Sequence, residues 1–404
     1  MFSKVLLPAL AVVGTAVAAT NSICEGPTIT INSAADASAL SDCSTIKGDV
    51  IISPSAAGVV SLDGPEQITG SLKIENNGAI TSFSSRTINS IGETFSLNNL
   101  TLLSTLAFTK LDDVKIISWA ALPALPSLTF TNSVSKAESV TITNTFMSTL
   151  DGLNLETVDT LNINNNNRLK TFSTQVTSVK TILNIDSNGR GLAVQLPNLI
   201  WAANMTLRNV SSVDIPSLAV VNGSFGCYGN YFTSLSAPNL TSVGNSANGQ
   251  GGLAVVANPS LANITIPLLE TVGGAFQIAN NSALDAISFP TLTQVGGAIN
   301  FYGSFSTPQL PKLNDVKGGF NMQSTVAIDC SGFKSQHDSG NIQGTYTCKT
   351  TANPTTGGGS SGSGSGSSSS GSSTSSSKSA AVSYGVNEFV MGASLVGGLL
   401  SMLL

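Results

Sequence analysis

The chain has 404 residues, of which 41% are hydrophobic, 10% charged and 6% aromatic, with a formal net charge of −5. This mild acidity, without clusters of Lys or Arg, excludes the electrostatic attraction on which nucleic-acid binding depends. A single histidine, His337, and five cysteines without a C-x-x-C motif exclude a His- or Cys-rich metal site, so we predict no metal or cofactor. The abundance of Gly, Ser, Thr and Asn at this length directs attention to internal repeats.

Residues 1–19 have the pattern of a secretory signal peptide. Lys4 precedes an apolar run from Val5 to Val17, and small residues up to Ala19 form a cleavage site. About thirteen apolar residues are too few to span a bilayer, which takes about 20. We therefore predict an extracellular protein whose folded region covers residues 20–349.

The C-terminal region divides into a stalk, residues 350–377, and a removable signal, residues 378–404. Residues 357–377 contain only Gly, Ser and Thr, and the chain ends in the apolar tail FVMGASLVGGLLSMLL. Small residues, a polar spacer of about 8 to 12 residues and a terminal apolar tail are typical of a glycosylphosphatidylinositol (GPI) attachment signal. Ser375 is the predicted attachment residue, with Ser379 as the alternative, so a lipid would hold the protein at the plasma membrane.

Secretion agrees with the number of N-glycosylation acceptors, which have the form N-x-S/T with x other than Pro. The seven acceptors are Asn99, Asn204, Asn209, Asn222, Asn239, Asn263 and Asn280. Disulfides persist in this compartment. Cys24 is expected to pair with Cys43, and Cys330 with Cys348, because each pair brackets one end of the folded region. Cys227 remains unpaired.

A repeat fills the middle of the chain. Four segments share Pro, Leu two residues later, Val at +5, Gly at +7 and apolar residues at +9 and +11; they begin at Pro216, Pro267, Pro290 and Pro311. Apolar residues at alternate positions indicate a short strand with one buried face. Proline precedes each strand, where its missing N–H costs no hydrogen bond of the sheet.

The same pair of apolar residues flanking one other residue recurs along the whole region. The thirteen predicted pairs are Val50/Ile52, Leu72/Ile74, Phe95/Leu97, Val114/Ile116, Val140/Ile142, Leu161/Ile163, Leu183/Ile185, Met205/Leu207, Phe225/Cys227, Leu253/Val255, Phe276/Ile278, Ile299/Phe301 and Phe320/Met322. Their mean spacing of about 22 residues lies within the leucine-rich-repeat range of about 20 to 29. We predict an all-β, parallel β-solenoid of about 13 turns, with a rod length on the order of 60 Å.

A solenoid needs caps at its ends. The segment SAADASALSD, residues 33–42, favours a short N-terminal capping helix with Ser33 as its N-cap. Cys227 occupies the +11 position of its repeat, so it should point into the core as a small apolar side chain.

The opening ITINSAADASALSDCSTIKGDVIIS resembles the start of receptor L-domains. With the signal peptide, the cap CSGF…GTYTC, the Ser/Gly stalk and the GPI tail, nearly the whole chain resembles the fungal GPI-anchored cell-wall organisation proteins, a group that includes sporulation-specific wall proteins. The resemblance implies a leucine-rich-repeat or L-domain-like solenoid at the cell surface or in the wall, where it serves wall organisation and integrity. It implies no catalytic residue.

The alternative is a β-helix enzyme acting on wall polysaccharide. Such hydrolases use two carboxylates a few ångströms apart. The only sequence-adjacent acids within the repeats are Asp112 and Asp113, which strand alternation would send to opposite faces. The G-H-G and R-I-K motifs of fungal pectinases of this shape do not occur. His337 follows the last repeat and is expected in a solvated loop, so we predict a protein that is not an enzyme.

A binding face is predicted from the outward positions +10 and +12. In the C-terminal half these positions carry amides and tyrosines, which suit sugar hydroxyls and ring faces or a flat protein partner. The candidate residues are Tyr228, Gln277, Asn300, Tyr302, Asn321 and Gln323. No acceptor Asn is expected at +8, +10 or +12 from the Met205 turn onward, which predicts a sugar-free face. The expected partner is a wall polysaccharide or a wall or membrane protein.

Overall fold

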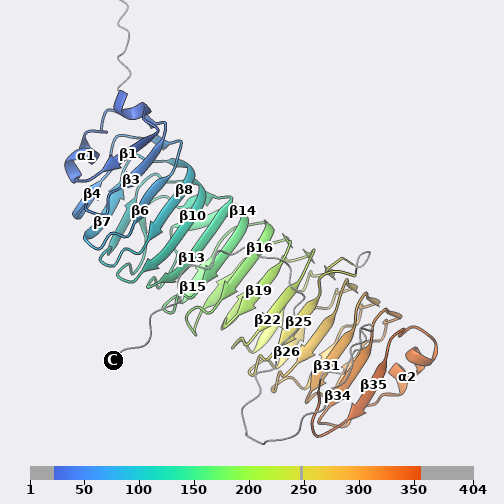
Figure 1. Ribbon diagram of the computed structural model, residues 1–404. Helices are drawn as coiled ribbons and strands as arrows, with labels where there is room; N and C mark the ends of the chain where they lie inside the picture. Colours follow the sequence, from blue (N-terminus) through green and yellow to red (C-terminus); the bar gives the residue numbers. More distant parts are fainter. Residues whose placement is uncertain (1–21, 246–248, 356–404) are drawn as a thin grey trace, which may run out of the picture. The chain divides into compact units, whose positions relative to one another are not determined.

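The structure, a computed structural model, describes residues 22–245 and 249–355. The predicted signal peptide, Ser375, Ser379 and nearly all of the predicted stalk and GPI signal lie outside the described residues. The described region is a parallel β-solenoid whose strands stack from helix α1 (Ala34–Ser38) at one end to helix α2 (Ser331–Asp338) at the other (Figure 1). A 3₁₀ helix, η1 (Ser22–Glu25), precedes the first strand.

One column of parallel strands runs the length of the solenoid, and each turn contributes one strand to it. These main strands are β1 (Thr28–Ile31), β3 (Asp49–Ile52), β6 (Leu72–Glu75), β8 (Ser90–Asn98), β10 (Asp113–Leu122), β13 (Ser139–Thr145), β14 (Leu153–Asn164), β16 (Ser178–Asp186), β19 (Met205–Arg208), β22 (Phe225–Tyr228), β25 (Leu253–Val256), β28 (Phe276–Ala279), β31 (Ile299–Gly303), β34 (Phe320–Ser324) and β35 (Tyr346–Thr350).

A second column of short strands lies directly before the main strands, and in several turns it is continuous with them. Its separate strands are β2 (Thr45–Ile46), β5 (Gln67–Ile68), β12 (Val134–Lys136), β18 (Trp201–Ala202), β21 (Val220–Val221), β24 (Ser242–Val243), β27 (Thr271–Val272), β30 (Gln294–Val295) and β33 (Asp315–Val316).

Smaller parallel sheets follow the main strands and close each turn. They comprise β4 (Gly58–Ser61), β7 (Ile80–Ser85), β9 (Thr105–Phe108) and β11 (Thr129–Phe130); β15 (Thr171–Ser173), β17 (Ala193–Gln195) and β20 (Ser212–Asp214); β23 (Ser234–Ser236) with β26 (Asn263–Thr265); and β29 (Ala286–Ser288) with β32 (Thr307–Gln309).

The predicted parallel solenoid is confirmed, and it is longer than expected. The thirteen predicted turns correspond to β3 through β34, while β1 and β35 add one turn at each end. Both added strands lie inside the segments that we assigned to the caps. Ile29 and Ile31 align with Val50 and Ile52, and Tyr346 and Cys348 align with Phe320 and Met322. Both strands therefore continue the alternation of the repeat, which the assignment of these segments to the caps overlooked.

The predicted pair of the fourth turn is wrong. The register pairs Ile117 with Phe95, so Ile117 and Trp119 hold the two inward positions that we had assigned to Val114 and Ile116. Val114 is also buried, but it aligns with Ile91 at the start of β10, where this strand continues the second column. The sequence V-K-I has the same alternation as a main strand, which explains the wrong assignment. The other twelve predicted pairs occupy the main strands in the expected register.

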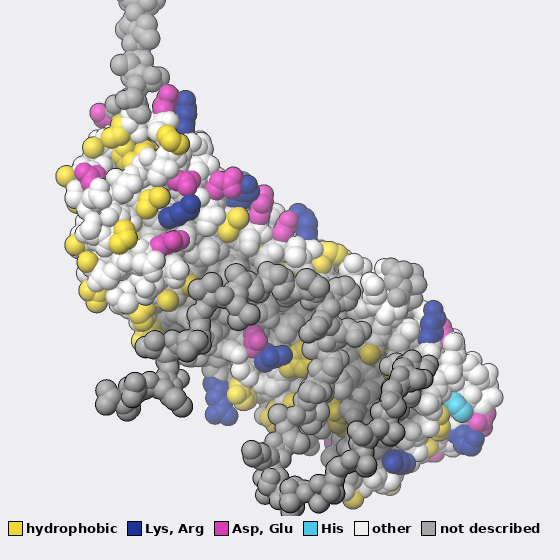
Figure 2. All heavy atoms as spheres, viewed as in Figure 1, with side chains coloured by type: hydrophobic (Ala, Val, Ile, Leu, Met, Phe, Trp, Pro, Cys, Tyr) yellow, Lys and Arg dark blue, Asp and Glu magenta, His cyan; other side chains and the backbone are white. Residues whose placement is uncertain are grey.

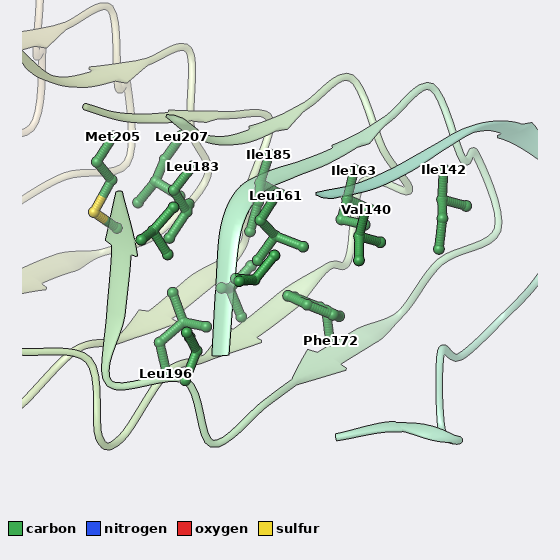
Figure 3. Close-up of a cluster of buried hydrophobic side chains, with 14 of the residues drawn as sticks. Val140, Ile142, Leu161, Ile163, Phe172, Leu183, Ile185, Leu196, Met205 and Leu207 are labelled. Carbon is green, nitrogen blue, oxygen red and sulfur yellow. The ribbon is translucent and has the colours of Figure 1, made fainter. Parts of the chain in front are cut away.

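The core is a continuous column of apolar side chains. Leu161, Ile163, Leu183 and Ile185 of neighbouring main strands lie in line, and Phe172 faces them from the opposite wall (Figure 3). All five are at most 2% exposed. Because the turns are parallel and in register, each apolar position packs against its equivalent above and below, which is how a solenoid buries its core.

A left-handed residue ends most main strands. Nine non-glycine residues with φ between 51° and 58° occupy this position: Asn76, Asn99, Ala121, Asn144, Asn165, Ser187, Asn209, Ala257 and Asn280. Asn tolerates this conformation better than most residues, which explains its frequency here. The following residue turns inward, and after Asn76, Asn165, Ala257 and Asn280 it is a buried asparagine: Asn77, Asn166, Asn258 and Asn281. Asn230 is buried likewise after Gly229, whose φ is 59°. Asn188, which follows Ser187, is buried in the same way.

Both ends of the solenoid carry a helix, although only the first was predicted. Ser33 caps α1 as expected, since its hydroxyl accepts a hydrogen bond from the Asp36 N–H at 3.3 Å. The expected loop around His337 is instead part of α2, and the His337 ring lies 5.0 Å from that of Tyr346. The segment SGFKSQHD contains only one large apolar residue, Phe333, so its helical pattern is weak.

The cysteines are arranged as predicted. Disulfides join Cys24 to Cys43 and Cys330 to Cys348, with Cα–Cα distances of 5.7 and 5.8 Å. Cys227 is a free thiol with no exposed surface. Burial raises its pKa far above the ordinary value, which disfavours the reactive thiolate.

Removal of the N-terminal disulfide should destabilise the solenoid strongly. The bridge closes a sequence separation of 19 residues, for which the chain-entropy estimate is about 3 kcal/mol. We expect Cys24→Ser/Cys43→Ser to lower the free energy of unfolding by that amount in urea titrations. Cys227→Val, the matched control, should change it by less than about 1 kcal/mol, since a small apolar side chain is conserved. Equal stability of all three proteins would contradict a capping role.

Candidate functional site

The six predicted binding residues lie in two adjacent outward columns on strands β22 to β34. Gln277, Asn300 and Asn321 stand next to one another in one column. Tyr228, Tyr302 and Gln323 belong to the other column, which continues to Lys349 of β35. We call this surface, defined by the six residues, the outer face.

Tyr228 forms an aromatic platform on this face. A Cβ atom at Gly226 would stand 2.3 Å from Cε2 of Tyr228, so the ring lies over Gly226 and needs a glycine there. The guanidinium of Arg208 lies 5.3 Å from the ring centroid, within the range of a cation–π contact. The ring is thus held against the sheet, and burial raises the pKa of its hydroxyl.

A small apolar cluster continues from the platform along the outer side of the sheet. Val256, Ala279 and Tyr302 are 4%, 0% and 6% exposed, and Tyr228 and Ala254 pack against them. Apolar residues at these positions face away from the main core. This cluster was not expected, because the alternation of the repeat assigns only one face of the strand to the interior.

The C-terminal end of the outer face is covered by the chain itself, which corrects the expectation of an open surface. Thr355 O accepts hydrogen bonds from Asn321 Nδ2 and Gln323 Nε2 at 3.0 and 3.1 Å. Asn321, Gln323 and Tyr302 are 6% exposed or less. Residues 351–355 therefore act as a strap over the last turns, while Tyr228, Gln277 and Asn300 remain half-exposed.

The seven glycosylation acceptors all reach the surface. Asn99, Asn204, Asn222, Asn239, Asn263 and Asn280 are exposed, and Asn209 is half-buried. Asn204 directly precedes Met205, which places it at the outward +8 position and corrects the sugar-free face predicted for that turn. From β22 onward, none of the predicted acceptors occupies an outward position of a main strand.

Most ion pairs among the described residues join successive turns. Lys73 pairs with Asp49 at 2.9 Å, Lys115 with Glu93 at 3.1 Å, and Lys180 with Asp159 at 2.9 Å. Figure 2 shows basic and acidic side chains side by side along the N-terminal half of the visible face. These exposed pairs contribute little stability individually, about 0 to 1 kcal/mol.

The two acids weighed for catalysis, Asp112 and Asp113, lie in different surroundings. Asp112 accepts a hydrogen bond from the hydroxyl of Ser135 at 2.7 Å, and Asp113 is exposed. Sequence reasoning missed Glu138 and Asp159, which stacking brings to adjacent turns beside a hollow of about 510 Å³. Their 21-residue spacing, equal to that of Val140 and Leu161, is the signal that could have revealed them. Three lysines line the same hollow, so it carries both signs of charge.

The described region contains no group of three or more His, Cys, Asp or Glu side chains placed to hold a metal ion. None of the helices in residues 22–245 and 249–355 is long and apolar enough to cross a membrane.

Comparison with known proteins identifies relatives over most of the chain. Residues 1–41 match the Ecm33 family, described as GPI-anchored cell wall organization proteins. "Protein ecm33" of Aspergillus fumigatus is 45% identical over 361 residues, which cover 89% of each chain. "Cell surface GPI-anchored protein ECM33" of Candida albicans is 33% identical, with 87% of this chain and 85% of the relative covered. No solved structure matches.

A less similar relative is a sporulation protein. "Sporulation-specific protein 2" of Saccharomyces cerevisiae is 30% identical over 72% of this chain and 58% of its own length. The 45% and 33% identities cover 89% and 87% of the chain, far more than the 41 residues that match the family model. The chain therefore belongs to the Ecm33 family of GPI-anchored cell wall organization proteins.

Proposed function

We propose that this protein is a non-catalytic rod at the outer face of the plasma membrane or in the cell wall, where it binds wall polysaccharide through the open part of the outer face. Its membership of the Ecm33 family supports the location and the role in wall organisation. We further propose that the signal peptide covers residues 1–19 and that Ser375, or alternatively Ser379, carries the GPI anchor.

The observation that carries the binding proposal is the ring of Tyr228 lying over Gly226 on the outward side of the sheet. The half-exposed ring offers apolar surface to a sugar ring, and the nearby amides of Gln277 and Asn300 can bond sugar hydroxyls. The strap leaves these three side chains half-exposed. A flat protein partner is the other ligand compatible with this surface.

A catalytic role as a polysaccharide-cleaving β-helix has weaker support. The relatives above are named as an ecm33 protein, a cell surface GPI-anchored protein and a sporulation-specific protein, and none of those names is that of an enzyme. Asp113, Glu138 and Asp159 share their hollow with three lysines, and Lys180 is paired with Asp159. The geometry therefore favours binding over hydrolysis.

The test is retention on insoluble β-glucan and chitin of protein released from cells by phosphatidylinositol-specific phospholipase C. We expect the wild-type protein to be retained by at least one of the two. Tyr228→Ala/Gln277→Ala should reduce the retained fraction about fivefold or more, since truncation of an aromatic anchor commonly costs over 1 kcal/mol.

Trp201→Ala is the matched control, because Trp201 is a half-exposed aromatic residue of β18 outside the outer face. It should be retained like the wild type. Equal retention of all three proteins would move the binding site away from the outer face. Failure of the wild type to bind either polysaccharide would favour a protein partner.

A further inference from the structure

A hollow of about 410 Å³ lies in the loops that follow strands β14 and β16, away from the outer face. Its lining is Asn167, Arg168, Leu169, Lys170, Gly189, Arg190 and Gly191. We call it the basic hollow, because three of these seven residues are cations and none is acidic. In a chain with net charge −5, three unopposed cations in one concavity are unusual.

The two arginines are positioned by aromatic rings and not by carboxylates. Cζ of Arg168 lies 4.3 Å from the ring centroid of Phe146, and that of Arg190 lies 4.8 Å from the centroid of Tyr231. Such stacking orients the planar guanidinium while leaving its N–H groups free. Within the part of the chain that the structure describes, neither arginine nor Lys170 forms an ion pair.

The loops beneath the cations are held rigidly. Asn166 and Asn188 are buried directly before the two loops, and the N–H of Asn166 donates to Asn188 Oδ1 at 3.1 Å. The N–H of Gly189 donates to Asn166 O at 3.0 Å. A Cβ at Gly189 would stand 2.4 Å from Leu169 O, so glycine allows the second loop to stack directly on the first.

The nearest acid in sequence is turned elsewhere. Asp186, four residues before Arg190, lies 3.7 Å from Arg208 and accepts a hydrogen bond from Ser187. No described residue accepts a hydrogen bond from the main-chain N–H of Arg190 or Gly191. The basic hollow therefore offers cationic and neutral donors on a fixed backbone, without a carboxylate to compete for them.

From this arrangement we propose that the basic hollow binds a phosphate monoester carried on a hydroxyl-rich small molecule, in effect a sugar phosphate. Two oriented guanidinium groups can each bind phosphate oxygens in a bidentate manner. The volume exceeds that of one phosphate ion and falls in the range of small-molecule sites, roughly 300–1,000 Å³. Asn167 and the glycine peptides supply polar groups for the sugar hydroxyls.

The experiment is calorimetric titration of the intact released protein with glucose 6-phosphate, glucose and inorganic phosphate. Glucose 6-phosphate should bind at least tenfold more tightly than glucose, and also more tightly than inorganic phosphate. Arg168→Gln/Arg190→Gln should weaken its binding at least tenfold. Arg168→Lys/Arg190→Lys keeps the positive charges but loses the bidentate guanidinium geometry. Its affinity for glucose 6-phosphate should therefore lie between those of the wild type and Arg168→Gln/Arg190→Gln.

The matched control is Arg86→Gln/Lys180→Gln, which removes two cations that are paired with Asp63 and Asp159 on other surfaces. It should bind glucose 6-phosphate like the wild type. Binding unaffected by the Arg168/Arg190 change, equal binding of glucose, or no binding by the wild type would each overturn the proposal. Sedimentation with phosphatidylserine-containing vesicles, lost in Arg168→Gln/Arg190→Gln, together with no glucose 6-phosphate binding, would instead assign the hollow to a lipid headgroup.

Discussion

Replacement of Asn258 by alanine should lower the free energy of unfolding by about 3–5 kcal/mol, because it interrupts the buried asparagines that connect successive turns. Asn258 Oδ1 accepts from the N–H and Nδ2 of Asn230 at 2.8 and 2.9 Å. Its own Nδ2 donates to Cys227 O and to Asn281 Oδ1 at 3.1 and 3.0 Å. Alanine would leave the Asn230 N–H and the Cys227 carbonyl buried without these partners.

Urea unfolding followed by circular dichroism measures the change in free energy, and hydrogen exchange locates it. Exchange should accelerate in the turns of Asn230 and Asn281 first, since stability in a solenoid depends on contacts between neighbouring turns. The control is Asn198→Ala, whose exposed amide donates to Gln175 Oε1 at 2.8 Å. It should change stability by no more than about 0.5 kcal/mol. Similar effects of both changes would mean that the buried ladder does not hold the turns together.

These asparagines show what the repeat pattern could and could not predict. Apolar alternation placed twelve of thirteen inward pairs, because burial of one strand face leaves a period of two that is visible in the sequence. Asn230, Asn258 and Asn281 are equally buried, yet their polarity made them resemble loop residues. Only the spacing, five residues after Phe225, Leu253 and Phe276, marks them as part of the repeat.

The outer face was predicted only in part, and the reason is the long range of the contacts that cover it. Alternation correctly turned Asn321 and Gln323 away from the core. Nothing local in the sequence shows that Thr355, more than thirty residues later, returns to bond both amides. The basic hollow was missed for a similar reason, because Arg168 and Arg190 become neighbours only through the stacking of turns.

Gly274→Ala should be the most disruptive single-methyl change in the C-terminal half of the solenoid. Gly274 is the +7 glycine of the repeat beginning at Pro267, and an added Cβ would stand 1.8 Å from Gly251 O of the preceding turn. The Cβ position and the Gly251 carbonyl are both fixed by the backbone, so neither can rotate out of the contact. The two turns would therefore have to move apart. We expect a loss of about 3 kcal/mol, the upper end of the usual range for overpacking, and reduced secretion.

Gly332→Ala is the control, because it should increase stability where Gly274→Ala decreases it. Gly332 lies in α2, and a Cβ there meets no atom within 4 Å. Alanine should raise stability by up to about 1 kcal/mol, because it favours the helix. If both variants melt like the wild type, the close stacking at Gly274 is not required. If only Gly274→Ala is destabilised, the +7 glycine is explained by contact between backbones of successive turns. A smaller loss should then follow at Gly297, where a Cβ would stand 2.6 Å from Gly274 C.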